Sequence, residues 1–154
     1  MNRFFKTVLL TGLFVGTTDM VSAFITVWVK TGGFATKMFL YLAGGALGLK
    51  TAAQGGVAVE FLGLFFQYFI SLAFTLFFFW IFPKIKFLAF NKYLIGMLYA
   101  VFVNVAMDQI LRLTPLPRGT FILARSYVDW VILGVLFGIP IVYNTYKYYG
   151  VETK

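Results

Sequence analysis

Four long apolar stretches constrain this sequence more than any other feature. They cover residues 7–29, 58–82, 93–111 and 127–146, and most of their ends are marked by lysine, arginine or proline. A helix that crosses the hydrocarbon core of a bilayer needs about 20 mostly apolar residues. Because lipid cannot satisfy backbone polar groups, such stretches must be helical. The sequence therefore predicts an all-α integral membrane protein, a four-helix transmembrane bundle that forms one domain over residues 1–154.

The composition of the 154 residues excludes a soluble domain. Hydrophobic residues make up 61% of the chain and charged residues 12%, whereas soluble domains average about 45–50% and about 25%. The chain has no cysteine and no histidine, which excludes disulfides, thiolate chemistry and imidazole ligands or bases. We therefore predict no metal and no cofactor. An enzyme is disfavoured, because only carboxylate, lysine, serine or tyrosine chemistry remains.

The formal net charge of +8 comes from basic residues that stand singly or in pairs at the ends of the apolar stretches. This distribution is typical of side chains that anchor helices at lipid headgroups. Nucleic-acid binding would require a clustered basic run, which the sequence lacks. The expected partner is therefore the lipid bilayer, and no nucleic acid is expected.

Four spans would put both termini on the same side of the membrane. With the termini inside, the inner side carries seven basic residues, Arg3, Lys6, Lys84, Lys86, Lys92, Lys147 and Lys154. The outer side then carries six, Lys30, Lys37, Lys50, Arg112, Arg118 and Arg125. The positive-inside rule therefore favours cytoplasmic termini by a slim margin. A cleaved signal peptide is disfavoured, because Thr17, Thr18 and Asp19 interrupt the first apolar stretch.

A shorter apolar segment, residues 38–49, lies between the first two stretches. Its length of about 12 residues is too short to cross as a straight helix. We expect a short interfacial or re-entrant helix, which Gly44, Gly45 and Gly48 would allow to lie close to its neighbours. A turn is expected over residues 51–57, which contain Gly55 and Gly56.

Four of the five acidic residues lie within or at the edges of the apolar stretches: Asp19, Glu60, Asp108 and Asp129. Asp19 lies ten residues from the end of the first stretch, about 15 Å deep at 1.5 Å per residue. A charge at that depth is costly and points to a partner or a functional site. Asp108 with Arg112, and Arg125 with Asp129, have the i,i+4 spacing of pairs that simply neutralise each other.

Small and polar residues form one stripe on each of the first two long helices. Steps of three and four join Gly12, Gly16, Asp19, Ala23 and Thr26, and likewise Glu60, Gly63, Gln67 and Ser71. We expect the two stripes to face each other inside the bundle. Three GxxxG spacings (Gly12 and Gly16, Gly44 and Gly48, Gly134 and Gly138) indicate close backbone packing. They predict a compact bundle, or a homodimer or larger membrane complex formed through these faces.

Several short motifs follow one another in an order that resembles a known group. They are Gly12, Gly16 and Asp19; then Leu42, Ala43, Gly44, Gly45 and Gly48; then Gly55 and Gly56; then Gly63, Leu64, Gln67 and Tyr68. This order resembles the small bacterial four-span inner-membrane proteins of the YagU type. The resemblance implies the same architecture and a bacterial inner-membrane location, for a family without a settled activity. The chain departs from the family pattern at Gln67, where histidine is expected, and at Met107–Asp108, where Met-Asn is expected.

The polar residues inside the spans lead to two functional hypotheses. In the first, a partly buried acidic cavity binds a polar or ionic ligand, or protons, and moves it across the membrane. Its inner residues would be Asp19, Glu60, Gln67 and Asn104, and its mouth would hold Asp108, Arg112, Arg125 and Asp129. In the second, the protein is a structural or accessory subunit, and Asp19 makes only an interhelical hydrogen bond. The sequence alone does not decide between them.

Overall fold

The computed structural model describes residues 2–32, 38–113 and 131–151, and within these ranges the chain is helical and contains no strand. The long helices are α1 (Arg3–Thr31), α4 (Val57–Ile81) and α5 (Lys92–Arg112). The carboxyl-terminal helix consists of residues 131–133, a π-helix η3 (Gly134–Gly138) and α7 (Ile139–Tyr149). The short elements are α2 (Met38–Leu47), α3 (Leu49–Gln54) and two 3-10 turns, η1 (Phe82–Lys84) and η2 (Lys86–Ala89).

Three of the described helical segments are long and apolar enough to span a membrane: Arg3–Thr26, Val57–Lys84 and Val131–Tyr149. The all-α class is confirmed, and the long apolar helices are those of an integral membrane protein. In α5 the apolar part covers Lys92–Met107 and is shorter. The fourth span therefore stays a prediction.

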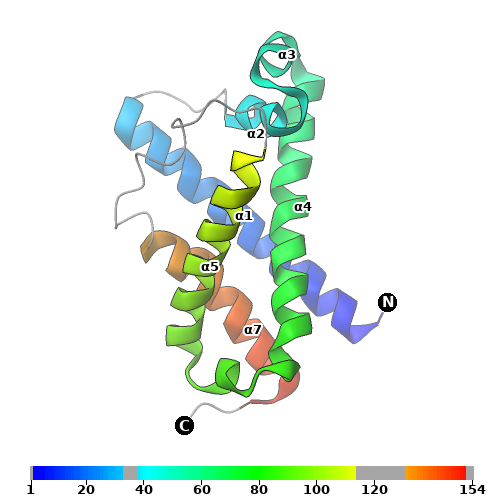
Figure 1. Cartoon of the computed structure of the whole chain (residues 1–154), viewed down its shortest axis with the longest axis vertical. Helices are drawn as coiled ribbons and strands as arrows, with labels where there is room; N and C mark the ends of the chain where they lie inside the picture. Colours follow the sequence, from blue (N-terminus) through cyan, green and yellow to red (C-terminus); the bar gives the residue numbers. More distant parts are fainter. Residues whose placement is uncertain (1, 33–37, 114–130, 152–154) are drawn as a thin grey trace.

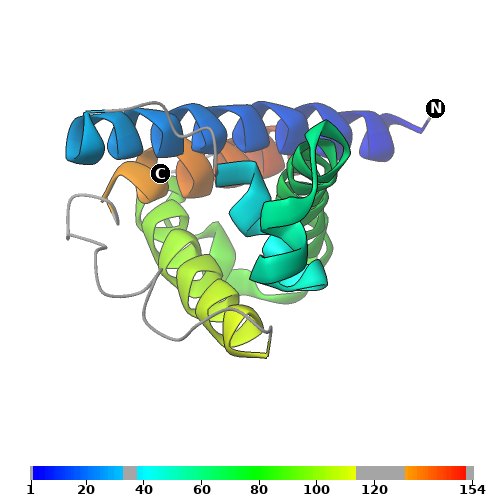
Figure 2. The ribbon, with the colours of Figure 1, turned by 90° about the horizontal axis from the view of Figure 1, so that it is seen from above.

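Two pairs of antiparallel helices make up the bundle. Figure 1 shows α4 and α5 running in opposite directions, while α1 and α7 cross the bundle obliquely. Seen from above, α1 and α7 lie along one another, with α4 and α5 to one side of them (Figure 2). Aromatic side chains fill the space between α4 and α5, where the rings of Phe78 and Tyr99 are 4.5 Å apart and those of Phe77 and Phe102 are 5.8 Å apart.

Local signals explain where the helices begin and end. Asn2 accepts a hydrogen bond from a backbone N–H in the first turn of α1 at 3.4 Å, so this helix begins before the predicted residue 7. Asn91 caps α5 by accepting two backbone N–H groups at 3.0 and 3.2 Å. Gly32 and Gly150, each with a φ of 67°, end α1 and α7. Pro83 stops α4, because its ring cannot continue the helix.

The short apolar segment differs from its prediction in one respect. A single helix was expected over residues 38–49, but α2 ends at Leu47 and α3 begins at Leu49. Gly48 between them has a φ of 82°, a conformation that breaks a helix and suits only glycine. The expected turn over residues 51–57 is shorter than predicted, because α3 continues to Gln54 and only Gly55 and Gly56 turn the chain.

Glycines set the close contacts between helices. A Cβ atom added at Gly16 would lie 3.1 Å from the Ser71 hydroxyl oxygen, so α1 and α4 are in direct contact along the two predicted stripes. At Gly63 the added atom would lie against the carbonyl of Phe39 in α2, and at Gly138 against the carbonyl of Gly96 in α5. The predicted facing of the α1 and α4 stripes is confirmed at this crossing.

One end of the bundle collects the start of α1, the end of α4 and the end of α7. The ring of Phe4 lies 5.8 Å from that of Tyr148 and 6.0 Å from that of Phe79. The Tyr149 hydroxyl donates to the Phe79 carbonyl at 3.0 Å, and the Tyr146 hydroxyl donates to the Leu88 carbonyl in η2 at 2.6 Å. We call this the terminal end, because the first and last described helices meet there.

Candidate functional site

Asp19 and Gln67 meet across α1 and α4. The amide Nε2 of Gln67 donates a hydrogen bond to Oδ2 of Asp19 at 2.7 Å, and both residues are half-buried. The glycine-lined crossing places them there, because Gly12 packs on Leu72 and Gly16 on Ser71, so the next residue of the α1 stripe falls opposite Gln67. The predicted approach of these two side chains is confirmed, while any function of the pair stays a prediction.

The hydroxyls that flank Asp19 in the sequence bond elsewhere. Thr17 donates to the Leu13 carbonyl of its own helix at 2.8 Å and lies 2.9 Å from the Tyr68 hydroxyl. Thr18 lies 3.0 Å from the Val15 carbonyl and 3.1 Å from the carbonyl of Leu136 in η3. These two threonines therefore join α1 to its two neighbours, and Gln67 of α4 donates to the Asp19 carboxylate.

Glu60 lies in the first turn of α4 and is half-buried. A carboxylate there is stabilised by the partial positive charge at the amino terminus of the helix. It stands seven residues before Gln67, which corresponds to about 10 Å along the axis. No hydrogen bond joins it to the Asp19–Gln67 pair in the described part of the chain. The structure thus places Glu60 two turns from the pair rather than beside it.

Two buried polar atoms have no hydrogen-bond partner among the described residues: Oγ of Ser71 and Oδ1 of Asn104. Ser71 is 1% exposed and follows Gln67 by one helical turn on the same stripe of α4. Asn104 is 7% exposed, and its Nδ2 donates to the Ala100 carbonyl of α5 at 3.0 Å. A buried polar group without a hydrogen-bond partner lowers the stability of the fold. These two atoms are therefore candidates to bind a small polar ligand.

Of the four residues predicted at the mouth of the site, the structure describes the helix that carries two of them. Asp108 and Arg112 lie in the last turns of α5. Arg125 and Asp129 lie outside the described residues. The two predicted ion pairs therefore stay predictions. Among the described residues, no group of three carboxylates is placed to hold a metal ion.

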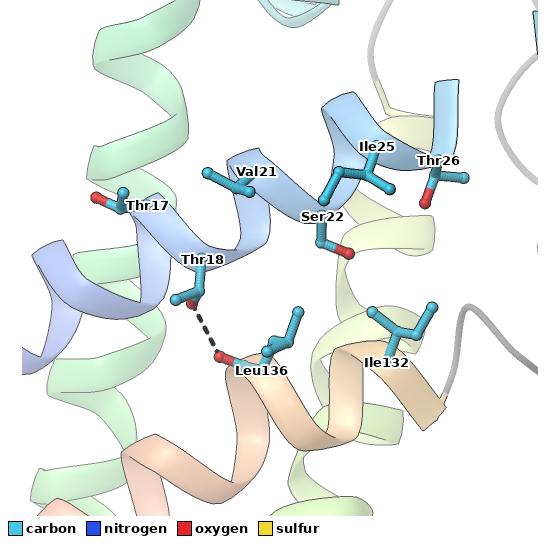
Figure 3. A pocket seen from close by; sticks show the side chains of 8 residues that line it. All are labelled: Thr17, Thr18, Val21, Ser22, Ile25, Thr26, Ile132 and Leu136. Atoms are coloured by element: carbon cyan, nitrogen blue, oxygen red, sulfur yellow. Dashed lines mark hydrogen bonds between the residues drawn. The ribbon is translucent and has the colours of Figure 1, made fainter. Parts of the chain in front are cut away.

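A groove of about 320 Å³ lies between α1 and the carboxyl-terminal helix (Figure 3). Its walls combine aliphatic side chains with hydroxyls, namely Thr17, Thr18, Val21, Ser22, Ile25, Thr26, Ile132 and Leu136. Four of these residues, Thr17, Thr18, Val21 and Ser22, lie within three positions of Asp19 on α1, while Asp19 and Gln67 themselves do not line the groove. Sequence reasoning missed this groove, because the α7 side of α1 carries no acidic residue to mark it.

Leu136 of the π-helix η3 lines the groove. Its bonds run from residue i to i+5, as shown by the Ile139 N–H donating to the Gly134 carbonyl. Pro140 has no N–H, so it cannot donate to the Leu136 carbonyl four residues earlier. The Thr18 hydroxyl of α1 donates to that carbonyl instead at 3.1 Å (Figure 3). The signal in the sequence was Pro140 inside an apolar stretch that also contains Gly134 and Gly138.

The fold and the site together define an all-helical membrane protein with a hydrogen-bonded carboxylate between two of its long helices. No family model, curated protein or solved structure matches the chain.

Proposed function

We propose that the chain is a bacterial inner-membrane protein that crosses the membrane four times, with α5 as the fourth span. The 21 residues of α5 extend for about 31 Å, which matches a hydrocarbon core of about 30 Å. The contact between the first turn of α1 and the last turn of α7 supports termini on one side. We include in this proposal that the chain is related to the YagU-type proteins, whose sequence motifs it resembles.

The distribution of charge supports a cytoplasmic terminal end. Its described basic residues are Arg3, Lys6, Lys84, Lys86, Lys92 and Lys147, and the described acidic side chains, Asp19 and Glu60, lie away from it. Excess lysine and arginine is typical of the cytoplasmic side. The ten residues of α2, about 15 Å long, would lie at the opposite membrane interface or partly re-enter the membrane.

The proposed activity is the binding of a small polar or ionic ligand, protons included, at Asp19 and Gln67, and its movement through the bundle. The observation that carries this proposal is the hydrogen bond of 2.7 Å between the two side chains inside membrane-length helices. An ionisable group at that depth is costly to maintain. The Ser71 hydroxyl lies one turn from Gln67 and has no hydrogen-bond partner among the described residues, so it offers a further polar contact to such a ligand.

A second candidate function is that of a structural or accessory subunit, because the same hydrogen bond would serve to join α1 to α4. Gly12, Gly16, Gly134 and Gly138 are buried against helices of the same chain. A homodimer or larger complex would therefore have to form through a surface that does not include these four glycines. The many exposed apolar side chains, for example Phe65 at 60% and Phe69 at 58%, would face lipid or a partner.

Asp19→Asn separates the two functions, because asparagine can still accept the hydrogen bond from Gln67 but cannot carry the charge. The measurement is the thermal unfolding midpoint of the purified protein in a neutral detergent. It is taken at pH 5.5, 7.0 and 8.5, and with sodium, potassium or ammonium chloride against choline chloride. A ligand at 100 times its Kd stabilises the folded state by about 2.7 kcal/mol. We expect at least one of these conditions to raise the midpoint of the wild type but not that of Asp19→Asn.

Glu152→Gln is the matched control, because it removes one carboxylate from the carboxyl-terminal tail and should respond like the wild type. If the wild type and Asp19→Asn respond equally to every condition, the carboxylate binds none of these ligands. The accessory function would then be the better account.

A further inference from the structure

A second groove, of about 290 Å³, opens at the terminal end between α1 and α7. Its mouth carries two cationic side chains, Arg3 from the first turn of α1 and Lys147 from the last turn of α7. Thr7 and Asn144 line it next to them. In the described part of the chain neither cation is paired with a carboxylate, and the Arg3 guanidinium lies 5.8 Å from the Tyr148 ring centre.

The polarity of this groove changes along the helix axis. Arg3, Thr7, Leu10 and Phe14 have the i, i+4, i+7 and i+11 spacing of a single face of α1. Leu10 and Phe14 are 58% and 57% exposed, and they lie about 10 and 16 Å further along the axis than Arg3. The groove is therefore cationic at the terminal end and mainly apolar toward the middle of the span, where the buried Thr11 also lines it.

We propose that this groove is a binding site for an anionic phospholipid. Arg3 and Lys147 would contact the headgroup phosphate, because guanidinium and ammonium groups are the side chains that bind phosphate oxygens. The Thr7 hydroxyl donates to the Arg3 carbonyl at 2.9 Å, and Nδ2 of Asn144 donates one of its two hydrogens to the Pro140 carbonyl at 3.0 Å. The second hydrogen of Asn144 Nδ2 would contact the polar linkage, and an acyl chain would lie along Leu10 and Phe14. A free phosphate would use only the cationic mouth, whereas a phospholipid uses both the mouth and the exposed apolar side chains of Leu10 and Phe14.

The test is a titration of the purified protein followed by native mass spectrometry. The probes are dioctanoyl-phosphatidylglycerol, dioctanoyl-phosphatidylcholine and inorganic phosphate. We expect the phosphatidylglycerol to bind at least tenfold more tightly than either of the others. In Arg3→Gln/Lys147→Gln its affinity should fall about tenfold. The exchange Arg3→Lys/Lys147→Arg keeps both charges and should stay within threefold of the wild type.

The matched control is Lys84→Gln/Lys86→Gln, which removes two charges from exposed residues at the same end but outside the groove. Its affinity for phosphatidylglycerol should change less than twofold. An equal loss in this control would overturn the proposal in favour of a diffuse charge effect. Equal binding of inorganic phosphate, or full competition by a hexaglutamate peptide, would overturn the lipid as the occupant.

Discussion

At the scale of single residues, Gly138 fixes how closely α5 and the carboxyl-terminal helix approach. A Cβ atom there would lie against the backbone carbonyl of Gly96, and that carbonyl cannot turn aside as a side chain would. Overpacking of this kind costs about 1–3 kcal/mol, while the better helix propensity of alanine returns up to about 1 kcal/mol. We expect Gly138→Ala to lower the free energy of unfolding by about 1–2 kcal/mol, and Gly138→Val to lower it further. Unfolding in mixtures of dodecyl sulfate and a mild detergent measures both.

Gly56→Ala is the control for this prediction. Nothing lies within 4 Å of the Cβ position at Gly56, and its backbone φ is −78°, which alanine adopts freely. The free energy of unfolding should therefore change by less than about 0.5 kcal/mol. If Gly138→Ala behaves like this control, α5 and η3 do not pack as closely as described.

The Asp19–Gln67 contact could be predicted from the sequence, whereas the partners of Thr17 and Thr18 could not. The small residues of the two stripes let α1 and α4 approach closely at Gly16 and Ser71, and the next residue of each stripe from this crossing is Asp19 and Gln67. A threonine in a helix can instead bond to the preceding turn of its own helix. Whether it also reaches a third helix depends on where that helix lies, which the stripes do not specify.

At the scale of elements, the π-helix is tied to α1 by one side chain. Thr18→Val keeps the shape of residue 18 but removes the donor to the Leu136 carbonyl. A hydrogen bond of this kind contributes about 0.5–1.5 kcal/mol, and we expect a loss in that range. Pro140→Ala restores an N–H that can donate to the Leu136 carbonyl. Thr18→Val should therefore lower the free energy of unfolding by less in the Pro140→Ala protein than in the wild type. A double-mutant cycle in detergent unfolding measures the coupling.

Thr75→Val is the control for this cycle, because the Thr75 hydroxyl donates to the Ser71 carbonyl within α4. Its cost should be the same with Pro140 or alanine at position 140. An equal cost of Thr18→Val in both backgrounds would mean that the threonine does not replace the donor that the proline lacks.

The sequence predicted where the helices begin and end more accurately than it predicted their hydrogen-bonding geometry. The predicted stretch 58–82 became α4 over Val57–Ile81, and 93–111 became α5 over Lys92–Arg112, because proline, lysine and asparagine mark those ends. The π-helix was not predicted, since an apolar stretch has the same composition whether its bonds run to i+4 or i+5. From the sequence, Gly48 was expected only to allow close packing against neighbouring helices. Its positive φ, seen in the structure, shows that it also separates α2 from α3.

At the scale of the whole molecule, the number of membrane crossings decides on which side of the bilayer each end of the bundle lies. The apolar stretches predicted the long helices, because a chain segment inside the hydrocarbon core must satisfy its own backbone hydrogen bonds. The near balance of seven basic residues against six left the orientation weakly determined from sequence. The contacts at the terminal end are what bring the first and last described helices together. With α1, α4 and the carboxyl-terminal helix as three spans, the number of crossings is even if α5 spans the bilayer and α2 does not.

The native chain has no cysteine, so single cysteines can be labelled without background. The most direct test of four crossings introduces one cysteine in turn at Lys6, Lys50, Lys86 and Arg118, and labels sealed, right-side-out vesicles with a membrane-impermeant maleimide. We predict that positions 50 and 118 label from outside. Positions 6 and 86 should label only after the membrane is permeabilised. Labelling of positions 6 and 86 from opposite sides would contradict the four-span bundle.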